Sequence, residues 1–396
     1  MTTKSSQAIT SPRFPTSVTR GSDHNSSSGS GRVRLDRFWL LDNLRGLASL
    51  SVVIWHYQHF YFSRPGSLPA SFDLSVQPLY SFLWPFYTFG FNAVQLFFIL
   101  SGFVFFFVYY DAVCDRAVTG FQFFILRFSR LYPLHFATLI FVALGQWVSI
   151  RSTGHFTVYV YNDLYYFVPN CLLISNWGLQ AGESFNGPIW SVSVEVLLYL
   201  LFFVYASQIA ARSSWHLRNC VAVWVALLAV QRVAPVAIAE LLYAALCFFA
   251  GGIVFFAWQR IAEHKRSHRL VLLAAVFVGG LTGFLLFVVT GYRPTLHFIL
   301  FPTLVLFLAI AQSLFLDAGQ RSRVIGDVSY STYLLHFPLQ LSIILLTAYV
   351  GIKIDFDRPV ILGVFFVILL FISIAAFYYF ERPMLKYIRK KMVRIG

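Results

Sequence analysis

The sequence predicts an all-α fold, a polytopic bundle of transmembrane helices with both chain ends in the cytoplasm. Hydrophobic residues make up 58% of the 396 residues and charged residues only 12%, and the mean hydropathy is +0.70. This composition lies outside the range of soluble globular domains. The apolar residues form segments close to the roughly 20 residues that a helix needs to cross a bilayer. The composition therefore excludes a soluble enzyme.

Eleven apolar segments are candidates for membrane-crossing helices. They cover residues 39–61, 84–109, 131–150, 163–180, 188–208, 218–235, 238–258, 270–290, 296–316, 329–350 and 359–380. The segment 163–180 is the weakest, because it is short and contains Asp163, Pro169 and Asn170. We expect it to form a re-entrant or short helix, which leaves about ten spans.

The basic residues set the orientation of these ten spans. Of the 30 Lys and Arg residues, 24 fall on one side of the predicted bundle and 6 on the other. Short cytoplasmic segments of membrane proteins carry an excess of basic residues, so both ends are placed in the cytoplasm. The same rule accounts for the net charge of +14, and we expect membrane lipid but no nucleic acid as a partner.

Composition divides the chain into three regions. Residues 1–36 are rich in Ser, Thr and Gly and contain no apolar stretch, which predicts a disordered, basic cytoplasmic tail. Residues 37–388 hold all the apolar segments, and residues 389–396 form a second basic tail. The four cysteines show no metal-ligand spacing, so no metal site is expected.

Arg45 and His56 form the most informative pair in the chain. They stand eleven positions apart in the first apolar segment, and eleven residues bring a helix round to within roughly 20° of its starting direction. Their side chains would share one face, about 16 Å apart along the axis. Ionisable residues at membrane depth usually face a cavity or a pathway. We therefore predict a functional axis, with Arg45 at the membrane edge and His56 near the middle.

A second basic pair, Arg127 and Arg130, stands at the start of the third apolar segment. Residues three apart share one helix face, and a pair of guanidinium groups suits phosphate oxygens. The alternative is that both are anchors that touch lipid headgroups on the cytoplasmic side. The spacing alone is equally compatible with both roles.

Two spans contain polar or small residues in apolar surroundings. Ser101 and Gly102 interrupt an aromatic segment, where Gly102 would permit close helix packing and Ser101 could donate a hydrogen bond into a cavity. Glu195 is the single acidic residue of the segment 188–208. A lone carboxylate inside a membrane needs a partner, so the structural alternative is an ion pair with Arg45 or another cation that only holds helices together.

The segment 329–350 carries Tyr333 and His336, three residues apart. That spacing could place both side chains in the same cavity as His56. The alternative for His336 is a hydrogen bond between two helices.

Six motifs in this order resemble the membrane acyltransferase-3 family. They are Leu-Asp-Asn-Leu-Arg-Gly-Leu at 41–47 with the following His56, Phe-Phe-Ile-Leu-Ser-Gly-Phe at 97–103, Arg-Phe-Ser-Arg-Leu-Tyr-Pro at 127–133, Trp-Ser-Val-Ser-Val-Glu at 190–195, Ser-Tyr-Ser-Thr-Tyr-Leu-Leu-His-Phe-Pro at 329–338 and Glu-Arg-Pro at 381–383. The resemblance extends from about residue 38 to 388, so residues 37–388 would form the acyltransferase domain.

The resemblance implies an enzyme of a bacterial inner (plasma) membrane. Such enzymes take an acyl group, usually acetyl, from acyl-CoA in the cytoplasm and pass it to a hydroxyl of a carbohydrate or a lipid-linked glycan. It also implies that Arg45 and His56 are the essential pair and that Arg127 and Arg130 contact coenzyme A. Many relatives add an SGNH esterase-like domain, and we expect this chain to act without one.

These inferences combine into one mechanism. We expect His56 to act as general base on the acceptor hydroxyl, with Glu195 orienting His56 or stabilising its charged form and Arg45 steering the thioester. Ser101, Tyr330 and His336 would help to bind the acyl-CoA donor. A covalent acyl-histidine intermediate, a longer acyl donor, and a transporter or flippase of a glycan or small metabolite are the alternatives.

Overall fold

The structure of the chain is a computed structural model that describes residues 35–392. Within this range every regular element is helical, and the only β-type pairing is an isolated bridge between Arg64 and Ser67. The all-α prediction is therefore confirmed. The predicted tail at 1–36 lies almost wholly outside the described residues, as do residues 393–396.

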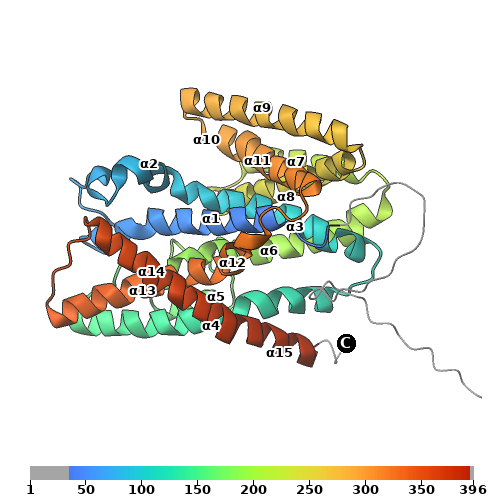
Figure 1. Cartoon of the computed structure of the whole chain (residues 1–396). Helices are drawn as coiled ribbons and strands as arrows, with labels where there is room; N and C mark the ends of the chain where they lie inside the picture. The colour runs from blue at the N-terminus through green and yellow to red at the C-terminus, as the bar shows by residue number, and fades with distance from the viewer. Residues whose placement is uncertain (1–34, 393–396) are drawn as a thin grey trace, which may run out of the picture.

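Ten long helices make up the bundle in the described part of the chain (Figure 1). They are α1 (Trp39–His56), α3 (Ala93–Cys114), α4 (Gly120–Thr153), α6 (Trp190–Val204), α7 (His216–Val233), α8 (Val236–Ala262), α9 (Arg266–Thr290), α11 (Phe301–Leu314), α13 (Ser329–Val350) and α14 (Pro359–Ala376). Shorter helices lie between or after them: α2 (Tyr80–Phe89), α5 (Leu164–Cys171), α10 (Arg293–Thr295), α12 (Arg323–Asp327) and α15 (Arg382–Met392).

Eight helical stretches among the described residues are long and apolar enough to cross a membrane. They include every predicted span except the two formed by α1 and α7, which are 18 residues long each. The segment 163–180 contains only the eight-residue helix α5, about 12 Å long, which agrees with its exclusion from the spans. Helix α15 continues the last span to Met392, four residues past the predicted domain boundary at 388.

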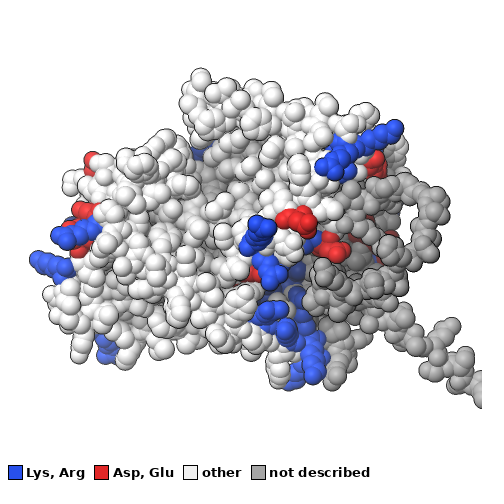
Figure 2. Space-filling model, in the orientation of Figure 1, with Lys and Arg blue, Asp and Glu red and all other residues white. Residues whose placement is uncertain are grey.

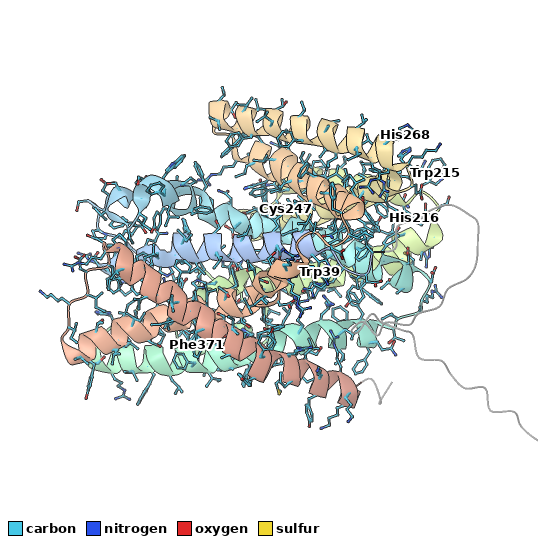
Figure 3. The ribbon with its side chains drawn as sticks, in the orientation of Figure 1. Trp39, Trp215, His216, Cys247, His268 and Phe371 are labelled. Atoms are coloured by element: carbon cyan, nitrogen blue, oxygen red, sulfur yellow. The ribbon has the colours of Figure 1, made fainter. Side chains whose placement is uncertain are left out.

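On the face drawn in Figure 2, most charged side chains lie toward the two ends of the bundle, and the surface between them is almost free of charge. Trp39, His216 and His268, which lie at or near the first residues of α1, α7 and α9, are found toward the same end of the molecule (Figure 3). These three helices thus start from one side, as the predicted alternation of spans requires. We call this end, which also holds Arg45, the inner end.

Helix α1 occupies the middle of the bundle and packs against α3, α12 and α13. Glycines permit the closest approaches. A Cβ atom on Gly46 of α1 would lie 2.5 Å from the carbonyl oxygen of Ile325 in α12. A Cβ atom on Gly326 of α12 would lie 2.6 Å from the carbonyl oxygen of Asp42 in α1. A Cβ atom on Gly102 would collide with the backbone of α8, which confirms close packing as the reason for this glycine.

Candidate active site

An inner cavity of about 110 Å³ lies between α1, α3, α4, α6 and α13. Six predicted site residues line it together: Arg45, Ser101, Arg127, Arg130, Glu195 and Tyr330. Its remaining lining is Leu41, Asp42, Phe97, Phe98, Leu100, Val104, Phe105, Leu131, Ser191, Val192, Tyr199, Ser329 and Tyr333. Three guanidinium groups face two carboxylates, those of Asp42 and Glu195, so the cavity suits an anionic ligand.

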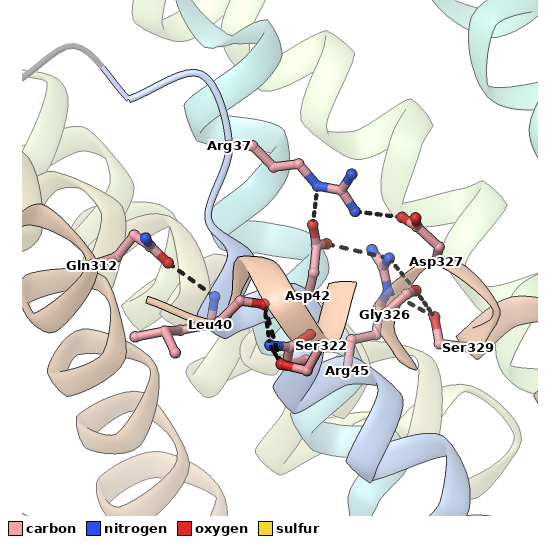
Figure 4. Close-up of polar contacts among 11 residues, drawn as sticks. Arg37, Leu40, Asp42, Arg45, Gln312, Ser322, Gly326, Asp327 and Ser329 are labelled. Atoms are coloured by element: carbon pink, nitrogen blue, oxygen red, sulfur yellow. Dashed lines mark hydrogen bonds and ion pairs between the residues drawn. The ribbon is translucent and has the colours of Figure 1, made fainter. Parts of the chain in front are cut away.

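Arg45 is held at this cavity by three neighbours (Figure 4). Its Nη2 lies 3.2 Å from Asp42 Oδ1 and donates to the carbonyl oxygen of Gly326 at 3.0 Å, and its Nε donates to Ser329 Oγ at 3.0 Å. Arg37 pairs with Asp42 as well and reaches Asp327 Oδ1 at 2.6 Å. These contacts tie α1, α12 and α13 together at the inner end of the cavity.

Arg127 and Arg130 lie on the same face of α4, as their spacing predicts. The Arg127 guanidinium lies over the rings of Phe105 and Tyr109, at 4.9 and 4.6 Å from the ring centroids. It also donates to the Tyr109 hydroxyl, whereas its buried Nε has no partner among the described residues. A guanidinium in this position retains donors for an incoming phosphate oxygen.

Glu195 lines the inner cavity. Among the described residues it makes no hydrogen bond with His56, although the sequence predicts a contact between them. Ser101 Oγ donates to Glu195 Oε1 at 2.8 Å, so the hydroxyl points toward the cavity as predicted. His56 Nδ1 lies 2.9 Å from the carbonyl oxygen of Val52, one turn earlier in α1. The expectation that Glu195 orients His56 is therefore wrong for this arrangement, because the packing of α6 turns Glu195 toward the arginines.

The alternative role of Glu195, an ion pair that only holds helices together, is not observed either. Among the described residues, Arg45 forms its ion pair with Asp42, and Glu195 forms an ion pair with no cation. Tyr330, the sixth predicted residue in this cavity, donates its hydroxyl to the carbonyl oxygen of Leu131 at 2.6 Å. That bond joins α13 to α4 at the cavity wall.

An outer cavity of about 460 Å³ contains His56. Its lining is Val52, Trp55, His56, Phe91, Val94, Gln95, Phe98, Tyr159, Glu183, Pro188, Trp190, Gln231, Ala239, Glu240, Tyr243, Ala244, Arg293 and Tyr333. His56 is the last residue of α1 and is 8% exposed. The imidazole therefore reaches this cavity from an otherwise buried position.

His336 lines neither of the two cavities, although it lies beside His56, and its part in donor binding stays a prediction. Its ring packs 4.9 Å from the ring of His56, and the ring of His59 lies at the same distance from that of His56. Its Nδ1 is 2.6 Å from the carbonyl oxygen of Tyr333, because residues three apart in α13 are neighbours. Helix α13 continues 14 residues past His336, about 21 Å, so the adjacent His56 lies deep in the bundle, as expected.

The outer cavity includes three charged residues that sequence reasoning missed, Glu183, Glu240 and Arg293. The surrounding protein and the Glu240 carboxylate raise the pKa of the Glu183 carboxyl above its usual value. A signal was present, because Glu183 and Glu240 are acidic residues next to the predicted outer ends of two spans. Their convergence depends on how the helices pack.

Phe98 and Tyr333 line both cavities. The Tyr333 hydroxyl donates to the carbonyl oxygen of Pro188 at 2.8 Å and lies 2.8 Å from Ser191 Oγ. The two cavities thus meet side by side, with arginines in one and His56 in the other. Such an arrangement can bring an anionic ligand and a second ligand together from opposite ends of the bundle.

Similar proteins are found in several bacteria. The protein named protein 2 in picA locus of Rhizobium radiobacter is 37% identical over 108 residues, which are 27% of this chain and 45% of that protein. Acyltransferase MdmB of Streptomyces mycarofaciens is 37% identical over 122 residues, 29% of this chain and 28% of MdmB. Exopolysaccharide production protein ExoZ of Rhizobium meliloti (strain 1021) is 28% identical over 323 residues, 78% of this chain and 94% of ExoZ.

The chain spans less than half the length of the first two of these relatives. No solved structure matches it. A family model described as an acyltransferase domain matches residues 38–395, nearly the whole chain and all six motifs. This protein therefore belongs to the acyltransferase-3 family.

Proposed function

We propose that this protein transfers an acyl group, most simply acetyl, from acyl-CoA in the inner cavity to a hydroxyl of a carbohydrate in the outer cavity. One observation carries the proposal: two cavities lie toward opposite ends of the bundle and share Phe98 and Tyr333. One contains three arginines and the other contains His56. Membership of an acyltransferase family favours this function over a transporter.

The donor would bind through its phosphates at the inner end. Arg45, Arg127 and Arg130 supply guanidinium groups that match phosphate oxygens. A cavity of about 110 Å³ is too small for a whole acyl-CoA molecule. The thin pantetheine arm and the thioester would enter it, while the nucleotide stays at its mouth.

The acceptor would bind in the outer cavity. Glu183 and Glu240 offer carboxylate oxygens to sugar hydroxyls, and Trp55 and Trp190 offer aromatic faces. The name of ExoZ, exopolysaccharide production protein, supports a glycan acceptor. A lipid-linked glycan in a bacterial inner membrane is the form that we propose.

In the proposed reaction His56 takes the proton of the acceptor hydroxyl while the hydroxyl oxygen attacks the thioester carbonyl. The bond from the acyl carbon to sulfur breaks and a bond from that carbon to oxygen forms. The coenzyme A thiolate leaves and receives the proton from His56. Glu195 and Ser101, which face the inner cavity, would contact the donor near its thioester.

Binding of acetyl-CoA to the purified protein in detergent, measured by calorimetry, tests the donor assignment. The double variant Arg127→Ala/Arg130→Ala should lose most of the affinity, because two phosphate contacts disappear. Arg151→Ala is the matched control, since Arg151 is an exposed arginine near the opposite end of the same helix. Equal binding by the double variant and the control would refute the donor site.

The covalent alternative has its own test. An acyl-histidine intermediate would leave one acetyl group on His56 after the protein is mixed with acetyl-CoA without acceptor and rapidly denatured. Mass spectrometry of the peptide that contains His56 would detect it. The direct attack that we propose leaves that peptide unmodified.

A further inference from the structure

Phe98 and Tyr333 form the boundary between the two cavities. They are the two residues common to both linings, and every other lining residue faces one cavity alone. Phe98 is 3% exposed and Tyr333 is 5% exposed. Their rings therefore occupy the space through which the cavities would otherwise join.

Both rings are held in place by neighbours. The Tyr333 hydroxyl donates to the carbonyl oxygen of Pro188, in the turn that precedes α6. Its ring meets the ring of Phe97 edge to face, with centroids 5.7 Å apart. The ring of Phe98 lies 6.4 Å from the ring of Trp190. Side chains of α3, α6 and α13 thus meet at this boundary.

The proposed chemistry requires the substrates to meet at the same place. The new ester bond joins an acyl carbon from the inner cavity to an oxygen from the outer cavity, and reacting atoms must approach to about 3–3.5 Å. His56 lies close to this point, since its ring is 4.9 Å from that of His336, which in turn is 5.9 Å from the ring of Tyr333. The boundary is therefore where transfer would occur.

We propose that Phe98 and Tyr333 position the acyl group at the point of transfer and separate the two cavities until an acceptor binds. The separation keeps water in the outer cavity away from the thioester, since water would otherwise take the place of the acceptor hydroxyl and hydrolyse it. The role in transfer rests on the proposed function. The separation itself is a physical property of the two side chains and can be measured without any catalysis.

Thiol labelling measures the separation directly. In a variant whose four native cysteines are replaced by serine, Val104→Cys places a thiol in the inner cavity and Gln95→Cys places one in the outer cavity. A membrane-impermeant methanethiosulfonate reagent is added to one side of sealed proteoliposomes. The side from which the thiol at position 95 reacts defines the outer side, and from there the thiol at position 104 should be protected.

Opening the boundary should remove this protection. Phe98→Ala should raise the outside labelling rate of the thiol at position 104 severalfold, whereas Phe98→Leu, which keeps most of the volume, should leave it low. Val94→Ala is the matched control, because Val94 lies one turn away on α3 and lines the outer cavity alone. An outside labelling rate that is unchanged by Phe98→Ala would overturn the proposal.

Acetyl-CoA turnover then tests the positioning role. Phe98→Ala and Tyr333→Ala should raise the ratio of hydrolysis to transfer, and Tyr333→Phe, which keeps the ring and loses the bond to Pro188, should raise it less. A merely structural role would lower both rates together and leave the ratio unchanged. If the thiol at position 104 is protected from outside labelling but the protein turns over no acetyl-CoA, the separation of the two cavities is upheld and acyl transfer from acetyl-CoA is not.

Discussion

Replacement of Gly46 by alanine tests whether the contact between α1 and α12 sets the position of Arg45. A Cβ atom at position 46 would lie 2.5 Å from the carbonyl oxygen of Ile325, whereas ordinary contact begins at 3.4 Å. The two helices must therefore separate by about 0.9 Å, and the obstacle is backbone that cannot rotate away. Overpacking of this kind costs about 1–3 kcal/mol of folding free energy.

The same substitution at an open site isolates that cost. A Cβ atom on Gly279 of α9 would meet no heavy atom within 4 Å outside its own helix and chain neighbours, so Gly279→Ala should only gain helix propensity, about 1 kcal/mol. Thermal unfolding in detergent should therefore show Gly279→Ala at or above the wild-type Tm and Gly46→Ala below it.

Acetyl-CoA affinity gives a second readout of the same change. Because Arg45 bonds to the carbonyl oxygen of Gly326 in α12, a displaced α12 should disturb Arg45 and weaken donor binding in Gly46→Ala. Gly279→Ala should bind as wild type. Equal Tm values and equal affinities for the two variants would show that the α1–α12 contact has neither the tightness nor the influence on Arg45 that we describe.

Three further outcomes are expected. His56→Gln should abolish acyl transfer yet retain acetyl-CoA binding by calorimetry, since the imidazole lies outside the inner cavity; loss of both would contradict the assignment. Ser331→Ala removes the hydroxyl that donates to the buried carboxylate of Glu381 at 2.7 Å and should cost about 1–3 kcal/mol, seen as a lower Tm. The pKa of Glu183 is raised above 4.5, so ionisation of this carboxyl disfavours the folded state. Glu183→Gln removes the ionisation and should therefore have a higher Tm than wild type. This difference in Tm should be absent at acidic pH and grow as pH rises above 4.5.

Sequence patterns predicted which residues enter the interior but not which cavity each one faces. The i, i+3 spacing placed Arg127 and Arg130 on one face, and they do line one cavity. Arg45 and His56 share a helix stripe, yet Phe98 and Tyr333 separate the cavities that they reach. The depth of a residue follows from its position in a span. The direction that its side chain faces depends on how neighbouring helices are rotated, and that is a property of packing.

Glu195 and His336 illustrate this limit. Both lie inside their spans as predicted, but Glu195 faces the arginines and His336 faces His56. Glu195 would have faced the outer cavity if α6 were rotated by part of a turn, whereas His336 lines neither cavity and lies beside His56 because of the rotation of α13. For Glu183 the sequence shows an acidic residue near the outer end of a span but not where its side chain lies, because it precedes the short helical turn Gly187–Ile189 in a connecting segment whose path no periodicity predicts.

The ion pairs at the inner end limit how firmly an anionic ligand can be held there. Arg45 and Arg37 already share the Asp42 carboxylate, and Arg37 also pairs with Asp327. A phosphate that binds Arg45 must compete with a carboxylate for the same donors, so the exchange of one anion for another gains little free energy. If acyl-CoA is the donor, as we propose, its affinity should be moderate, and coenzyme A would leave as the Asp42 carboxylate pairs with Arg45 again.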